Sequence, residues 1–422
     1  MPSARDITHL QQMKAFGGVR SGQGTLLQKL INLGILEQSN ASTVSLPPPK
    51  NPPYTPRLKP TVEWIEHEDG YWILRNPEHL TFLQVDAQTK GVIEQFGYVP
   101  LRDIAQQQGR DRVKPLLQQL TATGMFEGTS PPKPKQGKWT PLQLLNIKVP
   151  LCNPDQWLTR HIQPIQWIWT QQFFITLLCF LAFTAVFVLH HQSDIALTTQ
   201  QSLSHLTPTL ILSFIVFSVL VIALHELAHA FTLKRYNGTV PEIGIMLMLL
   251  MPIAYTNTTD QYRLPKRRQR GLVVGAGVLC QLLLGAIAFW VWSGAATGSW
   301  LWTAAYLMMM AAVVTVAINL NPLAKFDGYY LAIALSGINN LRQRSFEFYK
   351  HVFTLQPSHE TAGDRWILAA YAPFSLMYVL MVFGVLIIKI AAWILATIPI
   401  TAALLLALWA IYYFVWPTTP SR

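Results

Sequence analysis

The 422-residue sequence predicts a mainly α-helical membrane domain of about six transmembrane helices, preceded by a small α/β domain in the cytosol. Hydrophobic residues make up 51% of the chain and charged residues only 13%, a composition typical of membrane proteins. The long apolar segments follow residue 170, whereas residues 61–128 have the composition of a small soluble domain. The net charge of +11 comes from basic residues that cluster beside apolar segments, which indicates membrane orientation and not nucleic-acid binding.

Changes in composition divide the chain into five regions. The N-terminus lacks the apolar core of a signal peptide, so we expect the first region to stay in the cytosol. The regions are an N-terminal helix (about Gly24 to Glu37) with a proline-rich linker, residues 1–60; a small domain, 61–128; a basic linker and interfacial segment with tryptophans, 129–170; a transmembrane domain, 171–416; and a cytosolic tail, 417–422.

Residues 61–128 predict a hairpin followed by three helices. Apolar strands at 71–74 and 81–85 flank a turn that begins at Asn76. Helical spacing of apolar residues then predicts helices over 87–96, 101–108 and 111–123. This order is typical of a winged-helix-like domain. Such a domain can bind a peptide, pack on the membrane domain or bind DNA, although its few basic residues make a weak DNA footprint.

Apolar segments predict the membrane spans in order: residues 172–190, 208–230, 271–292, 300–320 and two more within 366–416, around a break at Lys389 to Pro399. Basic residues between 234 and 270 place the loop after the second span in the cytosol, on the same side as the N-terminal domain. The apolar stretch from Gly244 to Ile253 is too short to cross comfortably. It is either a re-entrant or interfacial hairpin, or a buried loop.

The second expected span carries the sequence His225-Glu226-Leu-Ala-His229 near its cytosolic end. Two histidines four residues apart share one helical face and can bind one metal ion, while the glutamate between them can act as a general base. Zn²⁺ suits such ligands and hydrolyses amides without redox chemistry. The alternative is a pair of buried, hydrogen-bonded histidines, but ionisable groups at bilayer depth are costly and usually functional. The three cysteines are widely separated and predict neither a disulfide framework nor a cysteine metal site.

A third metal ligand is expected from the segment Asn319-Leu-Asn-Pro322-Leu-Ala-Lys325-Phe-Asp327-Gly328, at the inner end of the fourth span. A zinc enzyme normally has three protein ligands and one open position. Proline and glycine interrupt a helix in this segment, so Asp327 can face the metal. Alternatively, Asp327 pairs with Lys325 or caps a helix that begins at Tyr329.

Two resemblances extend this interpretation. The features Gly70-Tyr-Trp-Ile-Leu74, Phe82-Leu-Gln-Val-Asp86 and Val113-Lys-Pro-Leu-Leu-Gln-Gln-Leu120 resemble PqqD-like domains, which bind the leader peptides of ribosomally made, modified peptides. The His225 motif together with the segment 319–328 resembles the site-2 protease family of intramembrane zinc metalloproteases. Together with the PqqD-like domain and the basic loop 260–270, this second resemblance points to one group within the family, the bacterial peptide zinc metalloproteases.

The second resemblance implies a role for each residue of the two motifs. His225, His229 and Asp327 would bind Zn²⁺, Glu226 would be the general base, and Asn319 would assist the site as a catalytic residue. Where many relatives have Ala-Gly-Pro-x-x-Asn, this chain has Ala276-Gly-Val-Leu-Cys-Gln281, so no substrate-binding role is carried over to that segment.

The expected activity is hydrolysis of a peptide bond in a membrane-associated, modified or exported peptide, on the cytosolic side of a bacterial inner membrane. The expected partners are the lipid bilayer, a peptide or membrane-protein substrate, and a secretion adaptor or transporter; no nucleic acid is expected. Two alternatives remain open: a non-catalytic, zinc-containing accessory subunit for peptide binding or export, and a transporter whose polar residues line a pathway. The intact glutamate between the two histidines favours the protease.

Overall fold

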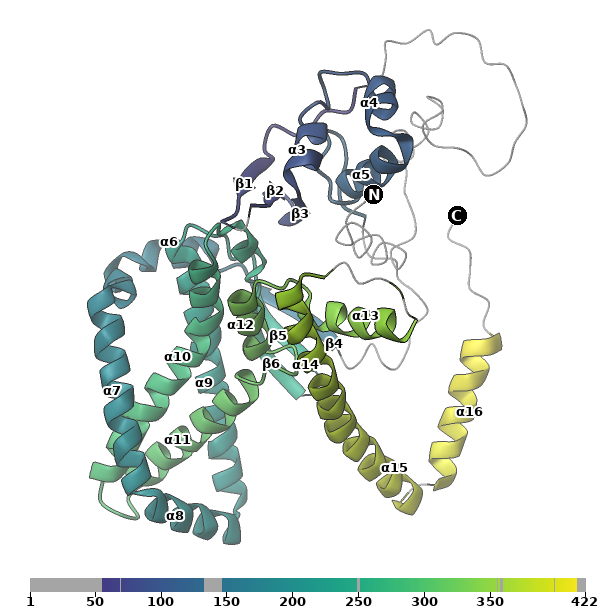
Figure 1. Cartoon of the computed structure of the whole chain (residues 1–422). Helices are drawn as coiled ribbons and strands as arrows, with labels where there is room; N and C mark the ends of the chain where they lie inside the picture. The colour runs from purple at the N-terminus through teal and green to yellow at the C-terminus, as the bar shows by residue number, and fades with distance from the viewer. Residues whose placement is uncertain are drawn as a thin grey trace. The chain divides into compact units, whose positions relative to one another are not determined.

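The computed structural model describes residues 55–68, 70–132, 146–248, 251–354, 356, 360–397 and 399–415 (Figure 1). The expected helix from Gly24 to Glu37 and the tail 417–422 lie outside the described residues. The chain forms two compact units. The first unit contains Met1–Gly137 and a distant segment, Thr259–Gln269; the second contains Lys138–Thr258 and Arg270–Arg422.

The first unit contains an antiparallel sheet followed by three helices. The strands are β1 (Glu63–Glu66), β2 (Trp72–Asn76) and β3 (Thr81–Val85), with β2 in the centre, and the helices are α3 (Ala87–Ile93), α4 (Leu101–Gln108) and α5 (Arg110–Ala122). The predicted hairpin and three helices are therefore present. Strand β1 was not predicted, because its four residues are too short for a periodic pattern.

The core of the first unit includes the apolar residues that the helical spacing selects. Asp86 caps α3 by accepting a hydrogen bond from the Thr89 amide, and Gly109, with a positive φ of 84°, allows the sharp turn from α4 into α5. The fully enclosed side chains of this core come from β2, all three helices and the segment after α5; they include Leu74, Ile93, Ile104, Leu117, Leu120 and Phe126.

The second unit is mainly helical. Its elements before the second sheet are α6 (Asp155–His161), the 3₁₀ helix η2 (Gln163–Trp169), α7 (Gln171–His190), α8 (Gln192–Ser204) and α9 (Pro208–Arg235). After the 3₁₀ helix η3 (Thr259–Arg263) follow α10 (Arg267–Gly294), α11 (Trp300–Asn319), α12 (Asp327–Ser336), α13 (Leu341–Phe353), α14 (Ala362–Val379), the π-helix η4 (Leu380–Gly384), α15 (Val385–Thr397) and α16 (Pro399–Val415).

Within the described residues, five helical stretches are long and apolar enough to cross a membrane, as expected of a multi-pass membrane protein. They are Gln171–His190, Pro208–Arg235, Arg267–Gly294, Trp300–Asn319 and Gly363–Ile394. The first four match the predicted spans. The fifth differs from the predicted boundaries, because α15 continues through Lys389 to Thr397.

A second antiparallel sheet lies in the second unit. The apolar stretch from Gly244 to Ile253 contributes to two strands, β5 (Ile243–Met248) and β6 (Met251–Thr256), which pair as a hairpin. The third strand, β4 (Asn146–Cys152), pairs with β5 and comes from the region expected to be a linker. β4 is an edge strand, which explains why it tolerates Pro150. Strand β6 lies along α9, the helix that carries both histidines.

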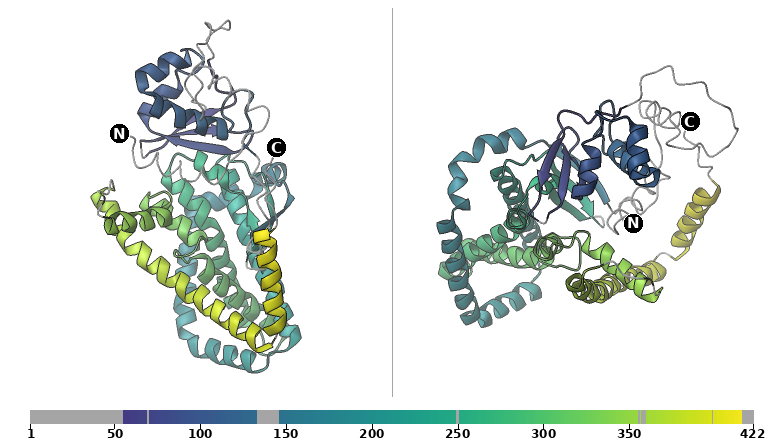
Figure 2. Two further views of the ribbon diagram at one scale, coloured as in Figure 1. Left: turned by 90° about the vertical axis from the view of Figure 1, so that its right-hand side faces the viewer. Right: turned by 45° about the horizontal axis from the view of Figure 1, so that its top comes forward.

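Helices α9 and α11 pack against each other, and two small residues of α11 lie at the contact. Val221 of α9 and Ala311 and Ala312 of α11 form a buried cluster. Small side chains let two helices approach closely, as is common in membrane proteins. Val221 lies one helical turn before His225, so this contact fixes α11 beside the part of α9 that carries the histidines. Figure 2 shows the helices of the second unit from two further directions.

Candidate metal centre

Helix α9 presents His225 and His229 on one face. Both imidazoles are buried, with exposed fractions of 3% and 6%. Their Nε2 atoms lie 3.0 Å apart, so the two rings converge on one point. The separation of four residues produces this convergence, because side chains at i and i+4 lie one above the other on a helix.

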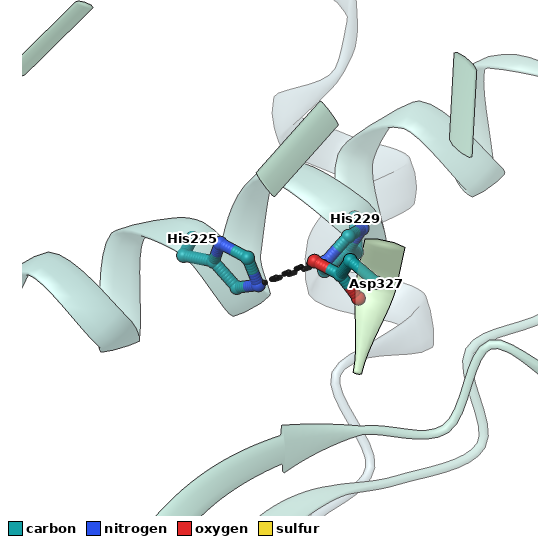
Figure 3. A group of neighbouring side chains, drawn as sticks. All are labelled: His225, His229 and Asp327. Carbon is teal, nitrogen blue, oxygen red and sulfur yellow. Dashed lines mark hydrogen bonds and ion pairs between the residues drawn. The ribbon is translucent and has the colours of Figure 1, made fainter. Parts of the chain in front are cut away.

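Asp327 completes a group of three converging side chains (Figure 3). Its Oδ2 atom lies 2.9 Å from Nε2 of His225 and 3.1 Å from Nε2 of His229. Asp327 is the first residue of α12, and Phe326 at the N-cap makes no side-chain capping bond. The structure therefore places Asp327 at the histidines and does not make it the cap of a helix starting at Tyr329.

Gly328 allows the chain to bring Asp327 to this position. A Cβ atom at residue 328 would collide with the backbone of Leu320 and Asn321, which lies at the end of α11. Glycine is the one residue that permits such a close backbone approach. The segment between α11 and α12 thus folds back tightly enough to put Asp327 beside α9.

The geometry of the three side chains fits a metal ion. In tetrahedral zinc sites with bonds of roughly 2.0–2.1 Å to nitrogen and oxygen, neighbouring ligand atoms lie about 3.3 Å apart. The observed separations of 2.9, 3.0 and 3.1 Å are close to that value. Two imidazole nitrogens and a carboxylate oxygen are also a donor set that divalent transition metals accept. His225, His229 and Asp327 can therefore hold such an ion.

Helix α10 orients the second imidazole. The backbone carbonyl of Val273 lies 2.7 Å from Nδ1 of His229, which donates the hydrogen bond. A bond at Nδ1 leaves the lone pair on Nε2, the atom that faces Asp327. One turn further along α10, Gly277 lies against both rings, and a Cβ atom there would collide with His225 and His229.

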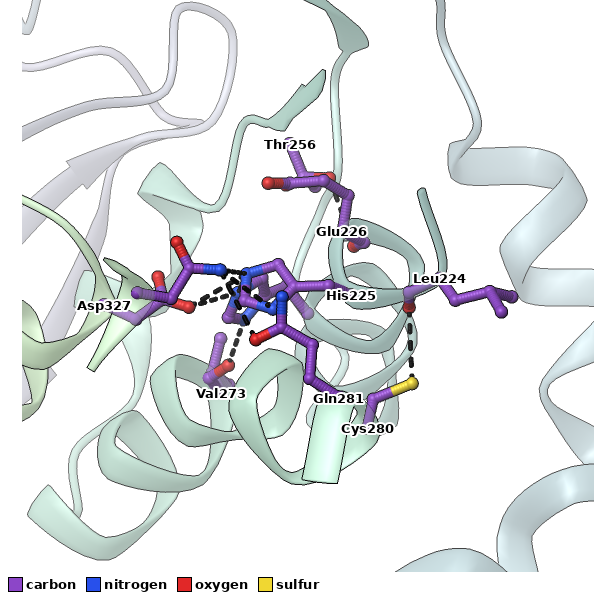
Figure 4. A network of polar contacts seen from close by, with 10 residues as sticks. Leu224, His225, Glu226, Thr256, Val273, Cys280, Gln281 and Asp327 are labelled. Atoms are coloured by element: carbon purple, nitrogen blue, oxygen red, sulfur yellow. Dashed lines mark hydrogen bonds and ion pairs between the residues drawn. The ribbon is translucent and has the colours of Figure 1, made fainter. Parts of the chain in front are cut away.

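Glu226 lies beside the three converging side chains and is not one of them. Thr256 of β6 donates a hydrogen bond of 3.1 Å from its Oγ1 to the Glu226 carbonyl oxygen. Figure 4 shows Glu226 and Thr256 together on one side of His225. This hydrogen bond joins the hairpin β5–β6 to α9 at Glu226, the residue expected to be the general base.

Asn319 lies at the C-terminal end of α11, next to His225. Its Nδ2 atom is 3.5 Å from each ring nitrogen of His225 and 3.4 Å from Oε1 of Gln281, to which it donates. Gln281 is fully buried, and its Nε2 atom has no hydrogen-bond partner among the described residues. The sequence interpretation gave Gln281 no role, although a lone glutamine inside an apolar span was a signal that could have singled it out.

The electrostatic environment keeps Asp327 ionised. Burial alone would raise the pKa of this carboxyl group, but hydrogen bonds to His225 and His229 more than offset the burial and hold the pKa well below its usual value. Asp327 is therefore a carboxylate at neutral pH, the form that binds a cation.

Comparison with known proteins finds one short similarity. No family model matches the chain, and no solved structure matches it. A stretch of 71 residues, 17% of this chain, is 31% identical to the uncharacterized protein MJ0971 of Methanocaldococcus jannaschii. The match covers 20% of that relative's length, so it concerns only a small part of either protein.

Proposed function

We propose that this protein is an intramembrane zinc metalloprotease of the site-2 protease type, acting on a membrane-associated or exported peptide. The observation that carries the proposal is the convergence of His225, His229 and Asp327 at 2.9–3.1 Å, from two segments about a hundred residues apart. The three side chains lie on and beside an apolar helix long enough to span a bilayer. Ionisable groups in such a place are costly unless they have a function.

The neighbouring residues suit peptide hydrolysis. Zinc, when bound, polarises a carbonyl group and lowers the pKa of water toward about 7. The Glu226 carboxylate then accepts the proton of the attacking water and can pass it to the leaving amine. The Asn319 amide can donate a hydrogen bond to the developing oxyanion, since its Nδ2 already lies beside His225.

We further propose that the first unit selects the substrate. Strand β2 is central in its sheet, so an extended peptide can be added only at β1 or β3. We assign it to β3, because the sequence around this strand resembles PqqD-like domains and strand addition satisfies edge hydrogen bonds. Tethering to the second unit would raise the peptide concentration at the metal centre.

Metal analysis of the purified full-length protein tests the proposed metal site. We expect about one zinc ion per chain in the wild type and loss of that ion in Asp327→Ala, because two imidazoles do not complete the ligand set. Asp194→Ala is the matched control, since this aspartate is exposed on α8 and belongs to no converging group among the described residues. Removal of the metal by a chelator should abolish peptide cleavage, and added zinc should restore it.

Two outcomes would contradict the proposal. Asp327→Ala protein that keeps its full zinc content would show that Asp327 is not a ligand. Zinc-loaded wild-type protein that cleaves no peptide from a library of membrane-anchored peptides would favour the non-catalytic accessory subunit.

A further inference from the structure

The segment Thr259–Gln269 belongs to the first unit, although both of its flanking sequences belong to the second. It begins with η3 and ends with the first residues of α10. The first unit therefore consists of two pieces of chain, and its second piece is a loop of the predicted membrane domain.

A buried ion pair holds this loop in the first unit. Arg75 of β2 donates two hydrogen bonds to Asp260, from Nε to Oδ1 at 2.7 Å and from Nη2 to Oδ2 at 3.0 Å. The Arg75 side chain is 4% exposed and that of Asp260 is completely buried. Hydrogen bonding to Asp260 keeps the pKa of Arg75 above its usual value, although burial acts in the opposite direction. A two-pronged contact of this kind fixes orientation as well as distance.

Weaker contacts extend along the rest of the loop. His67 donates from Nε2 to the Tyr262 carbonyl oxygen at 3.0 Å, and the Tyr262 ring lies 5.9 Å from that of Phe82. The Glu68 amide donates to the Pro265 carbonyl oxygen at 3.3 Å. The Glu68 carboxylate in turn accepts from the Arg267 amide at the start of α10. The first unit thus contacts the loop from η3 to the first turn of α10.

The two ends of the loop lead directly to the candidate metal centre. Just before it, Thr256 donates to the Glu226 carbonyl oxygen. Just after it, Val273 accepts from Nδ1 of His229. Arg267 and Val273 belong to the same continuous helix, α10, so a shift of its first turn is transmitted to the Val273 carbonyl. The Thr256 hydroxyl and the Val273 carbonyl, which both bond to α9, are therefore close in sequence to the loop that Arg75 holds.

We propose that Arg75 is a positioning residue for the metal centre: by holding Asp260, the first unit fixes the loop whose two ends orient His229 and the Glu226 backbone. This inference rests on the proposed metal-binding function and adds a second role for the first unit, besides recognition of the peptide. Groups that orient a ligand from outside the metal sphere commonly change metal affinity by about 10- to 100-fold.

The test is zinc affinity of the detergent-solubilised full chain, measured by competition with a chelating dye. Arg75→Gln and Asp260→Asn should each raise the Kd for zinc by about 10- to 100-fold. Arg75→Lys keeps the charge but loses the two-pronged contact, so a smaller increase is expected. Lys59→Gln is the matched control, because Lys59 of the same unit forms its ion pair with Glu78, a residue outside the loop. It should leave the zinc affinity unchanged.

A double variant separates positioning from a loss of folding. Arg75→Met with Asp260→Leu replaces the ion pair by apolar side chains that can pack together, and such replacements commonly preserve stability. It should restore zinc affinity toward the wild-type value. Wild-type affinity in both single variants would overturn this inference alone. Failure of the wild type to bind zinc would overturn the proposed function and this inference together.

Discussion

Gly277 is the residue that most directly limits the space around the two imidazoles. A Cβ atom at this position would collide with His225 and His229, whereas a Cβ atom at Gly275 would meet nothing within 4 Å. We therefore expect Gly277→Ala to displace the rings and to lower zinc occupancy markedly, although alanine favours a helix more than glycine does. Metal analysis at equal protein concentration checks this expectation.

Gly275→Ala is the matched control, since it makes the same change in the same helix. It should keep its zinc and be slightly more stable, by up to about 1 kcal/mol, because the alanine backbone has less freedom to lose on folding. Equal zinc contents in the two variants would mean that the space between α10 and the imidazoles does not control binding.

Gln281 orients the amide of Asn319 by accepting its hydrogen bond. Replacing it with leucine of similar size removes the acceptor and frees Asn319 to rotate. We expect Gln281→Leu to keep the metal and to lower kcat by about tenfold, less than the roughly 10²- to 10³-fold loss on removal of a direct oxyanion donor. The neighbouring Cys280→Ala should leave kcat nearly unchanged. A change confined to KM would show that Gln281 contacts substrate and does not position Asn319.

At the level of secondary structure, the elements with long periodic patterns were predictable. The first four spans, the hairpin of the first unit and its three helices all have apolar spacing that identifies them within a few residues. The hairpin β5–β6 was also among the predicted alternatives. Strands β1 and β4 were not predicted, because both are edge strands, whose stability depends on their partners more than on a pattern of their own.

The candidate site was predictable where its residues lie in motifs. His225, His229 and Asp327 were expected together, and the structure places them together. The orienting groups could not be found in the same way. A backbone carbonyl such as that of Val273 has no residue signature, and the partners Arg75 and Asp260 are 185 residues apart in sequence. The basic residues of the loop 260–270 indicated membrane topology. They gave no sign that Asp260 in the same loop is buried.

At the level of the whole molecule, the first unit is connected to the second in more than one place. The chain passes between the units after Gly137 and again on either side of Thr259–Gln269. We expect that cutting the linker between residues 132 and 146, at an inserted protease site, will leave the N-terminal fragment bound to the remainder. The buried Arg75–Asp260 pair and the neighbouring hydrogen bonds hold the loop after the cut.

After the cut, the C-terminal part is purified through a tag. The measured quantity is the amount of N-terminal fragment that co-purifies with it. Arg75→Gln should release the N-terminal fragment, because it removes the guanidinium group that pairs with the buried Asp260 carboxylate. Lys59→Gln should not release it. Full release of the fragment from the wild type would show that the loop contacts are too weak to retain it.

We propose as the central claim that the His225–Glu226–His229 motif performs metal-dependent peptide hydrolysis, with separate roles for the metal ligands and the general base. The most direct test is to compare Glu226→Gln with the wild type, measuring zinc content and peptide cleavage on the same preparation. The side chains have almost the same shape, and Glu226 is not among the three converging ligands, so the variant should keep its zinc. Without a carboxylate to accept the proton, it should lose cleavage by at least about 10²-fold. A zinc-loaded Glu226→Gln protein that cleaves peptide at the wild-type rate would contradict the claim.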